Sequence, residues 1–296
     1  MPQKPISATL LTAGVIFSMF LWGLSWPSGK ALSEYCTAIN FSVYRYVLVI
    51  AAMLVLLLSL GISLRVQRAG IRSVLISGVL LAGYSYFYFR GIKAGSAGAG
   101  GVLVTIMNPL MAYTIGIFLN RRWPTRNETI GLILGVIAGG ILLQLWHNAN
   151  ALFDTGNLFF LLSALTWAVM SKFTSRGAMY GSSLGFSLWQ YVVTLACLAP
   201  FMDVPELKAA FAITDSVFWL NLFFSSVIVT AGATTMYFYT TTRLGAEKAS
   251  SFIFLVPLAA SLSSWLFLGE RILPHTAIGG VLGIAAVYIM NKKAVK

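Results

Sequence analysis

The chain has 296 residues and a formal net charge of +12, yet only 9% of its residues are charged and 58% are hydrophobic. A soluble domain carries about 25% charged residues. This composition, with a mean hydropathy of +0.84, therefore excludes an ordinary soluble protein. Because helices satisfy their own backbone hydrogen bonds in lipid, we expect an all-α polytopic membrane protein.

Ten apolar stretches are long enough to form helices that cross a bilayer, which takes roughly 20 residues each. We predict transmembrane helices near residues 8–32, 38–61, 71–93, 96–119, 127–146, 155–176, 184–202, 216–243, 247–268 and 274–291. Five of them precede a polar link around residues 146–153 and five follow it. We therefore divide the chain into a first five-helix repeat, residues 1–147, and a second, residues 148–296.

The two halves repeat one pattern. At spacings of 145 and 148 residues, the matching positions include Trp22 and Trp167, Tyr46 and Tyr191, and Pro109 and Pro257. An odd number of helices in each half inverts the second half relative to the first. Inverted repeats are a common transporter architecture, in which the ligand lies near the bilayer midplane between the halves. We expect ten transmembrane helices as two inverted five-helix repeats around a central cavity.

Basic residues gather at alternate helix ends. With the N-terminus in the cytoplasm, the inward-facing set is Lys4, Arg65, Arg68, Arg72, Arg121, Arg122, Arg126, Lys172, Arg176, Arg243, Lys248, Lys292, Lys293 and Lys296. Because Lys and Arg concentrate on the cytoplasmic side of membrane proteins, we expect both termini there. This placement indicates contact with the lipid bilayer and argues against nucleic acid as a partner.

Aromatic side chains dominate the predicted membrane interior. Trp22 and Trp167 are equivalent positions near the middle of their helices, Tyr84 and Tyr88 share one helix face, and Tyr237 lies at similar depth. Rings of this kind often fill space between helices. If the halves are related by a two-fold axis, however, both tryptophans face the cavity, where rings would cover the apolar body of a substrate.

Weakly polar residues could bind a dipolar head group. Ser25, Asn108 and Ser251 are the candidates, although Ser and Asn in membrane helices also bond to nearby backbone. Lys30 and Arg45 fall in the outer third of their helices, where they either line an outer vestibule or extend to water. Their repeat mates, Ser175 and Gln190, are uncharged, so the halves differ electrically.

Prolines and glycines within the predicted spans affect helix geometry and helix packing. Pro109 and Pro257 are repeat mates within predicted spans, and we expect them to act as hinges or as simple kinks. Glycines recur at four-residue spacing in the fifth and tenth spans, where they either pack helices within one chain or mediate a dimer: Gly131, Gly135, Gly139, Gly279 and Gly283. We expect a monomer, with the dimer as the alternative.

Catalytic and metal chemistry find little support in the sequence. The two histidines, His147 and His275, fall at predicted outer helix ends, and no acidic residue lies within the core of a predicted span. A hydrolase needs a base at depth, so we expect no enzyme, no metal site and no cofactor. Cys36 and Cys197 both fall toward the outer side, which leaves a disulfide as an alternative to two free thiols.

Three short motifs resemble those of EamA-type members of the drug/metabolite transporter superfamily. They are Trp22-Gly23 followed by Lys30 and Arg45, Leu165-Thr166-Trp167-Ala168, and Gly269-Glu270-Arg271. The resemblance covers essentially the whole chain and extends to bacterial exporters of aromatic amino acids. It implies two inverted five-helix repeats, a central substrate cavity, and export across a bacterial inner membrane.

Together these features predict a secondary transporter that exports neutral amino acids, with aromatic and large apolar side chains favoured. A broader metabolite or drug exporter is the alternative within transport. A sugar-phosphate or nucleotide-sugar carrier is less favoured, because no basic cluster lies at the predicted midplane to hold phosphate. From a different class, a membrane binding protein without transport, or an intramembrane enzyme, remains an alternative.

Overall fold

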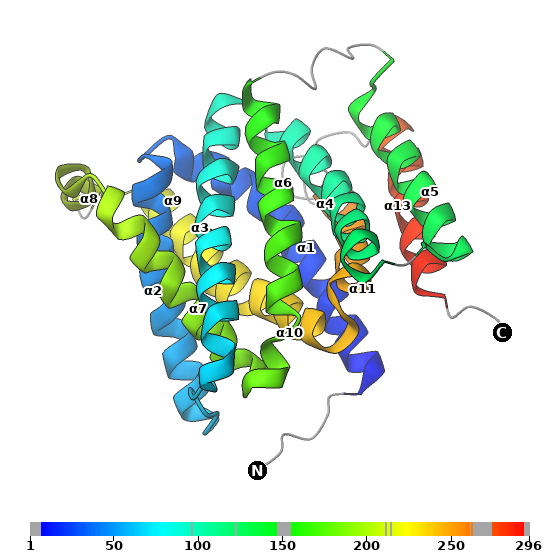
Figure 1. Ribbon diagram of the computed structural model, residues 1–296. Helices are drawn as coiled ribbons and strands as arrows, with labels where there is room; N and C mark the ends of the chain where they lie inside the picture. The colour runs from blue at the N-terminus through cyan, green and yellow to red at the C-terminus, as the bar shows by residue number, and fades with distance from the viewer. Residues whose placement is uncertain are drawn as a thin grey trace.

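The computed structural model describes residues 7–95, 97–121, 123–146, 155–210, 212–213, 215–260, 262 and 274–292. Across these residues the chain is helical apart from short links, and none of them forms a β-strand (Figure 1). The helices long and apolar enough to cross a membrane are Thr9–Ser33, Ala38–Ser59, Arg68–Ala94, Thr155–Tyr180, Ser183–Phe201 and Ser216–Leu244. Two shorter apolar helical stretches are Leu103–Leu119 and Ala277–Asn291. The expected all-helical, multi-pass membrane protein is confirmed, while the count of ten crossings and their inverted relation remain predictions.

The helices of the first half lie close to their predicted ranges. They are α1 (Ala8–Ser33), α2 (Ala38–Ser59), α3 (Ile71–Ala94), α4 (Ala97–Asn120) and α5 (Arg126–Leu143). Side-chain caps define several starts: the Thr37 hydroxyl accepts from the Asn40 backbone N–H, and Thr125 and Glu128 form a reciprocal capping box. Helix α5 ends three residues before the predicted limit because Gln144 takes a left-handed conformation, with φ of 49°.

The second half contains more and shorter elements than expected. They are α6 (Thr155–Thr174), α7 (Ser183–Leu198), α8 (Val204–Ala210), α9 (Ser216–Phe223), α10 (Thr235–Leu244), α11 (Ala246–Ser251) and α13 (Pro274–Asn291). Helix α7 stops before the predicted residue 202, in a short 3₁₀ turn that contains Pro200. Helix α8 lies between the predicted spans 184–202 and 216–243, where no helix was predicted. Much of the predicted span 247–268 lies outside the described residues.

Two stretches of the second half depart from regular α-helix. The π-helix η5 (Phe224–Thr234) joins α9 to α10, and within it the Thr230 hydroxyl donates to the Ser225 carbonyl over 2.7 Å. The 3₁₀ turn η6 (Phe252–Leu255) follows α11 and precedes a helical stretch that contains Pro257. Proline lacks a backbone donor and crowds the preceding turn, which accounts for tightening there. Its mate Pro109 lies inside the continuous helix α4.

Helices from opposite halves pack against one another. Helix α3 packs on α6 and α7, and its counterpart in the second half, formed by α9, η5 and α10, packs on α1 and α2. Helices α5 and α13, which are the last of each half, stand side by side at the right of the view (Figure 1). This reciprocal pairing is the pattern that a two-fold relation between the halves would produce.

The glycines of α5 and α13 serve packing within the chain. A Cβ atom at Gly131 would lie 2.1 Å from Met290, and one at Gly135 would lie 2.3 Å from the Phe254 ring. The remaining members behave alike, since Gly139 abuts Ile106, Gly283 abuts the Phe254 carbonyl, and Gly279 is buried. The small residues thus allow helices to approach closely, which is the first of their two expected roles.

The outer surface carries large apolar side chains that suit contact with lipid. Phe17, Val55 and Leu58 are each more than 60% exposed. Cys36, between α1 and α2, and Cys197, on α7, are both free thiols. The structure therefore contains two free thiols in place of the alternative disulfide.

Candidate functional site

A small internal cavity lies where helices of both halves meet. Helices α1, α2, α3, α4 and α6 and the π-helix η5 contribute to its wall, and its volume is about 60 Å³. This is room for about five water molecules, whereas sites for small ligands typically measure roughly 300–1,000 Å³. The expected binding residues on its wall are Trp22, Ser25, Tyr84, Tyr88, Asn108 and Trp167.

Aromatic rings in mutual contact form much of the wall. Trp22 and Trp167 meet edge to face, with ring centroids 5.2 Å apart, and Tyr84 lies 4.6 Å from Trp167. Trp26 and Tyr88 extend this group, with centroids 4.8 Å apart. Such ring pairs add about 0.5–1.5 kcal/mol each beyond their burial. The rings therefore hold one another in place and present a preformed apolar surface to the cavity.

Polar contacts fix the orientation of two cavity residues. The Trp22 indole N–H donates to the Thr234 hydroxyl of the π-helix over 3.2 Å, which ties α1 to the second half. The Ser25 hydroxyl donates to the Trp22 carbonyl over 2.7 Å and leaves its lone pairs for another donor. The Oδ1 atom of Asn108 is buried and has no hydrogen-bond partner among the described residues.

Two of the expected binding residues do not reach the cavity wall. Tyr237 packs behind it, with its ring centroid 5.0 Å from Trp22 and 5.6 Å from Trp167. Ser251 is fully buried and donates to the Lys248 carbonyl, while it accepts from the Asn291 amide over 2.7 Å. We therefore assign Tyr237 to the support of the tryptophans and Ser251 to helix packing.

Arg45 lies deeper than the sequence indicated. Its side chain lines the cavity and the residue is only 8% exposed, so it does not extend to water. The guanidinium carbon sits 5.2 Å from the Tyr46 ring centroid and 5.1 Å from the Phe89 ring centroid. Two cation–π contacts supply about 0.5–2 kcal/mol each, whereas isolating a buried ion costs several kcal/mol. The protein thus leaves a cation incompletely compensated in the wall.

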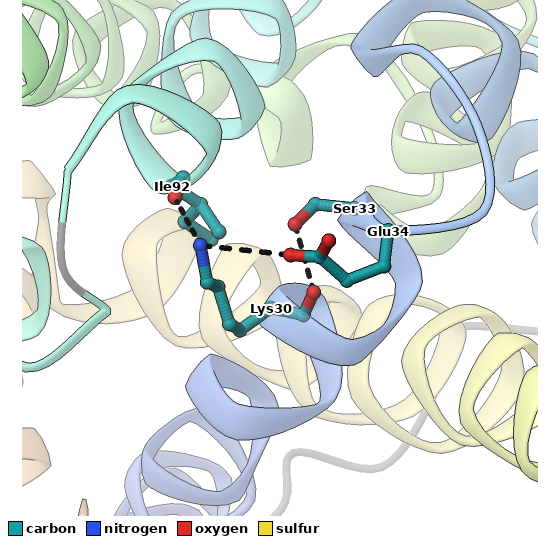
Figure 2. A network of polar contacts seen from close by, with 4 residues as sticks. All are labelled: Lys30, Ser33, Glu34 and Ile92. Atoms are coloured by element: carbon teal, nitrogen blue, oxygen red, sulfur yellow. Dashed lines mark hydrogen bonds and ion pairs between the residues drawn. The ribbon is translucent and has the colours of Figure 1, made fainter.

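Lys30 occupies a different environment from Arg45, at the C-terminal end of α1. Its ammonium donates to the Ile92 carbonyl over 3.4 Å and lies 3.7 Å from the Glu34 carboxylate, as Figure 2 shows. The side chain is 43% exposed, and it is absent from the cavity wall. A pair this exposed contributes little stability. The hydrogen bond to Ile92 links the end of α1 to the end of α3.

Several cavity residues were not among those predicted from the sequence. Trp26 follows Trp22 by four positions and so shares its helix face, a signal that was available. Thr105 precedes Asn108 by three positions and therefore also shares a helix face with a predicted residue. The wall residues of the π-helix, Ser225, Val229, Thr230 and Thr234, could not be inferred in this way, because a π-helix shifts which side chains share a face.

These features define a multi-pass helical membrane protein with an internal, ring-lined cavity. The model of the EamA-like transporter family matches residues 10–144 and, separately, residues 154–292. The chain therefore belongs to the EamA-like transporter family. The expectation of a transporter of the drug/metabolite superfamily is confirmed at this level.

Relatives with curated names are also described as transporters or related proteins. An uncharacterized transporter, sll0355 of Synechocystis, is 26% identical over 94% of this chain and 89% of its own length. The chain spans about half, 51%, of the WAT1-related chloroplastic protein At3g02690 of Arabidopsis thaliana, at 25% identity over 69% of this chain. A probable terminal-alkyne amino-acid exporter of Streptantibioticus cattleyicolor is 31% identical over 36% of this chain and 35% of its own length.

The fold also occurs in a solved crystal structure. That structure superposes with a TM-score of 0.70 at 18% sequence identity, and it covers 95% of this chain and 97% of the other. At this identity the likeness establishes the fold alone.

Proposed function

We propose that this protein is a secondary transporter that exports neutral amino acids with aromatic or other large apolar side chains. The observation that carries the proposal is the cavity wall, in which five aromatic side chains line one space: Trp22, Trp26, Tyr84, Tyr88 and Trp167. Burial of an apolar body there gains about 25 cal/mol per Å² of apolar area removed from water. Ring faces also attract an ammonium group.

The size of the cavity supports transport by alternating access. At about 60 Å³ it is too small for an aromatic amino acid. Transport of such a substrate therefore requires helices to separate on one side of the membrane to admit it, and on the other side to release it. The separate family matches to residues 10–144 and 154–292 support two equivalent halves as the moving parts.

The amino-acid substrate rests on two further lines of support. One relative is named a probable terminal-alkyne amino-acid exporter, although it matches only 36% of this chain. We also infer this class from the general similarity of the sequence to bacterial exporters of aromatic amino acids, with YddG as the suggested likeness. We place the protein in a bacterial inner membrane with both termini in the cytoplasm, on the strength of the basic residues at alternate helix ends.

A broader metabolite or drug exporter is the second candidate, because a ring-lined wall also accepts other flat, apolar molecules. Counterflow in proteoliposomes tests both candidates. Vesicles loaded with unlabelled phenylalanine should accumulate labelled phenylalanine transiently, and labelled methionine more weakly. Accumulation of unrelated aromatic drugs but of neither amino acid would favour the broader exporter. Saturable binding with no counterflow of any compound would indicate a binding protein and contradict transport.

A further inference from the structure

Arg45 is the one charged residue in the buried core of the described part of the chain. It projects from α2 into the same cavity that the rings of α1, α3 and α6 line. A buried cation normally has a carboxylate partner, since the pair offsets the loss of hydration. The groups around Arg45 therefore show whether its charge has a carboxylate partner within the protein.

No carboxylate of the described residues lies within 4 Å of this guanidinium. Its Nε atom is buried without a hydrogen-bond partner, and Nη2 donates only a long bond, 3.4 Å, to the Tyr46 hydroxyl. Described acidic residues are engaged elsewhere: Glu34 with Lys30, Glu247 with Lys172, Glu206 with Asn40, and Asp215 with Tyr35. The donors of Arg45 thus remain available to an anion that enters the cavity.

The wall offers a second unsatisfied polar group. Asn108, on α4, is 2% exposed and its Oδ1 atom has no partner among the described residues. An amide oxygen accepts hydrogen bonds, so it can receive an ammonium group, while a guanidinium fork binds a carboxylate through two parallel bonds. The rings that would cover an apolar body line the same cavity.

We propose that Arg45 binds the carboxylate of the transported molecule, and that the cavity takes small monocarboxylates with an apolar or aromatic body. In amino acids, Asn108 receives the α-ammonium group. This assignment rests on the proposed transport function and specifies how its substrate is recognised.

The repeat mate of Arg45 explains why one carboxylate suffices. Gln190 is uncharged and fully buried, and its Oε1 atom accepts a hydrogen bond from the Thr174 hydroxyl over 3.2 Å. Among the described residues that line the cavity, only the first half supplies a cation, so this wall has one anion site on one side. Substrate therefore binds in a single orientation, with its carboxylate toward α2.

Ligands that differ in one group test the assignment on the full chain, purified in detergent. The probes are phenylalanine, 3-phenylpropionate, which lacks the ammonium, and phenylalaninamide, which lacks the carboxylate. We expect wild-type protein to bind phenylalanine most tightly and 3-phenylpropionate less tightly. In Arg45→Gln, which copies the residue of the second half, the Kd for both acids should rise at least tenfold, while weak binding of phenylalaninamide should not change. Arg45→Lys should show an intermediate loss.

Arg90→Gln is the matched control, because Arg90 also lies over a ring, that of Phe159 at 5.7 Å, but on the exposed surface. It should bind all three probes as the wild type does. Ligand-free Arg45→Gln should unfold at the same or a higher temperature, since it lacks an unpaired buried charge. A lower unfolding temperature together with equal losses for all three probes would show a structural role and overturn the assignment.

The outcome separates this proposal from the transport proposal. Arg45-dependent binding of both acids, with no counterflow in vesicles, would uphold the carboxylate site and contradict transport. Undiminished phenylalanine counterflow in Arg45→Gln would uphold transport and overturn the carboxylate site. Failure of the wild type to bind either acid would also overturn it.

Discussion

The indole rings of Trp22 and Trp167 meet edge to face, with centroids 5.2 Å apart and ring planes at 85°. The two residues occupy equivalent positions in the two halves. A residue that lies near a two-fold axis touches its own mate, so this contact marks where such an axis would pass. Tyr46 and Tyr191 form a second contact of mates, with ring centroids 6.0 Å apart.

The hydrogen bonds of these tyrosines are equivalent too. The Tyr46 hydroxyl bonds to the Ser85 hydroxyl over 2.7 Å, and the Tyr191 hydroxyl bonds to the Thr235 hydroxyl over 2.9 Å. Each bond joins the second helix of its half to the third span. The same kind of hydrogen bond thus occurs within each half, as a structural repeat would require.

Removal of the paired tryptophans should weaken substrate binding in a coupled manner. Trp22→Ala and Trp167→Ala should each raise the half-saturation concentration for phenylalanine counterflow about tenfold, because each removes roughly 1.4 kcal/mol of ring contact. The double variant should lose less than the product of both effects, since each ring supports the other. Trp123→Ala, at a side chain that is 90% exposed, is the control and should transport normally. An unchanged half-saturation concentration in the double variant would show that the two rings do not contribute to substrate binding.

Gly100 should be far less tolerant of substitution than Gly83. A Cβ atom at Gly100 would lie 2.2 Å from the fully buried Phe160 ring, whereas one at Gly83 would lie 3.7 Å from Thr166. Overpacking of this kind costs about 1–3 kcal/mol. Gly100→Ala should therefore lower the thermal unfolding midpoint in detergent, while Gly83→Ala should keep or raise it because alanine favours helix. Equal midpoints for the two variants would contradict the close packing of α4 on α6.

The Cys36 thiol should resist alkylation at neutral pH. Burial, assisted by the nearby Glu206 carboxylate, raises the pKa of this thiol from 9.0 to about 12. A raised thiol pKa keeps the neutral form dominant, so at pH 8 the thiolate fraction should be roughly a thousandfold lower than for a thiol of pKa 9. Mass spectrometry after maleimide treatment should show Cys36 unmodified unless the protein is unfolded. Rapid modification of the native protein at pH 8 would show that the thiol is accessible and ionised.

Pro257 should influence the rate of transport more than the affinity. The residue follows the 3₁₀ turn Phe252–Leu255, at which the helix geometry changes. If the segment bends there during transport, Pro257→Ala should slow counterflow several-fold with an unchanged half-saturation concentration. Pro27→Ala, within α1, is the comparison for a proline in an unbroken helix. An unchanged transport rate in Pro257→Ala would contradict a hinge at this position and would indicate that the proline only kinks the helix.

The sequence predicted the helices well because long apolar stretches leave few structural alternatives in lipid. It also placed Trp22 and Trp167 at the contact between halves, since equivalent positions in an inverted repeat approach the same axis. The ends of α5 and α7 differ from the predicted limits by a few residues, at Gln144 and near Pro200, because hydropathy does not encode local backbone conformation. Helix α8 was missed for the same reason, as it is short and partly polar.

Burial of individual polar residues was harder to predict. Arg45 lies about one third of the way along α2. From there a long side chain can either extend to water or point into the protein, and only the packing of its neighbours decides which orientation it takes. Ser251 illustrates the converse: its depth suggested substrate binding, but Asn291 from α13 lies within hydrogen-bonding distance. Such partners, like the π-helix of residues 224–234, depend on contacts between distant segments.

Site-directed accessibility of the cavity tests the account most directly. Ser25 would be replaced by cysteine in a Cys36→Ser/Cys197→Ser background, and reconstituted protein would be treated with a membrane-impermeant maleimide from either face. We predict modification from both faces, with phenylalanine protecting the introduced thiol. Modification from one face alone, unaffected by phenylalanine, would contradict a cavity that opens alternately to the two sides and holds an amino acid.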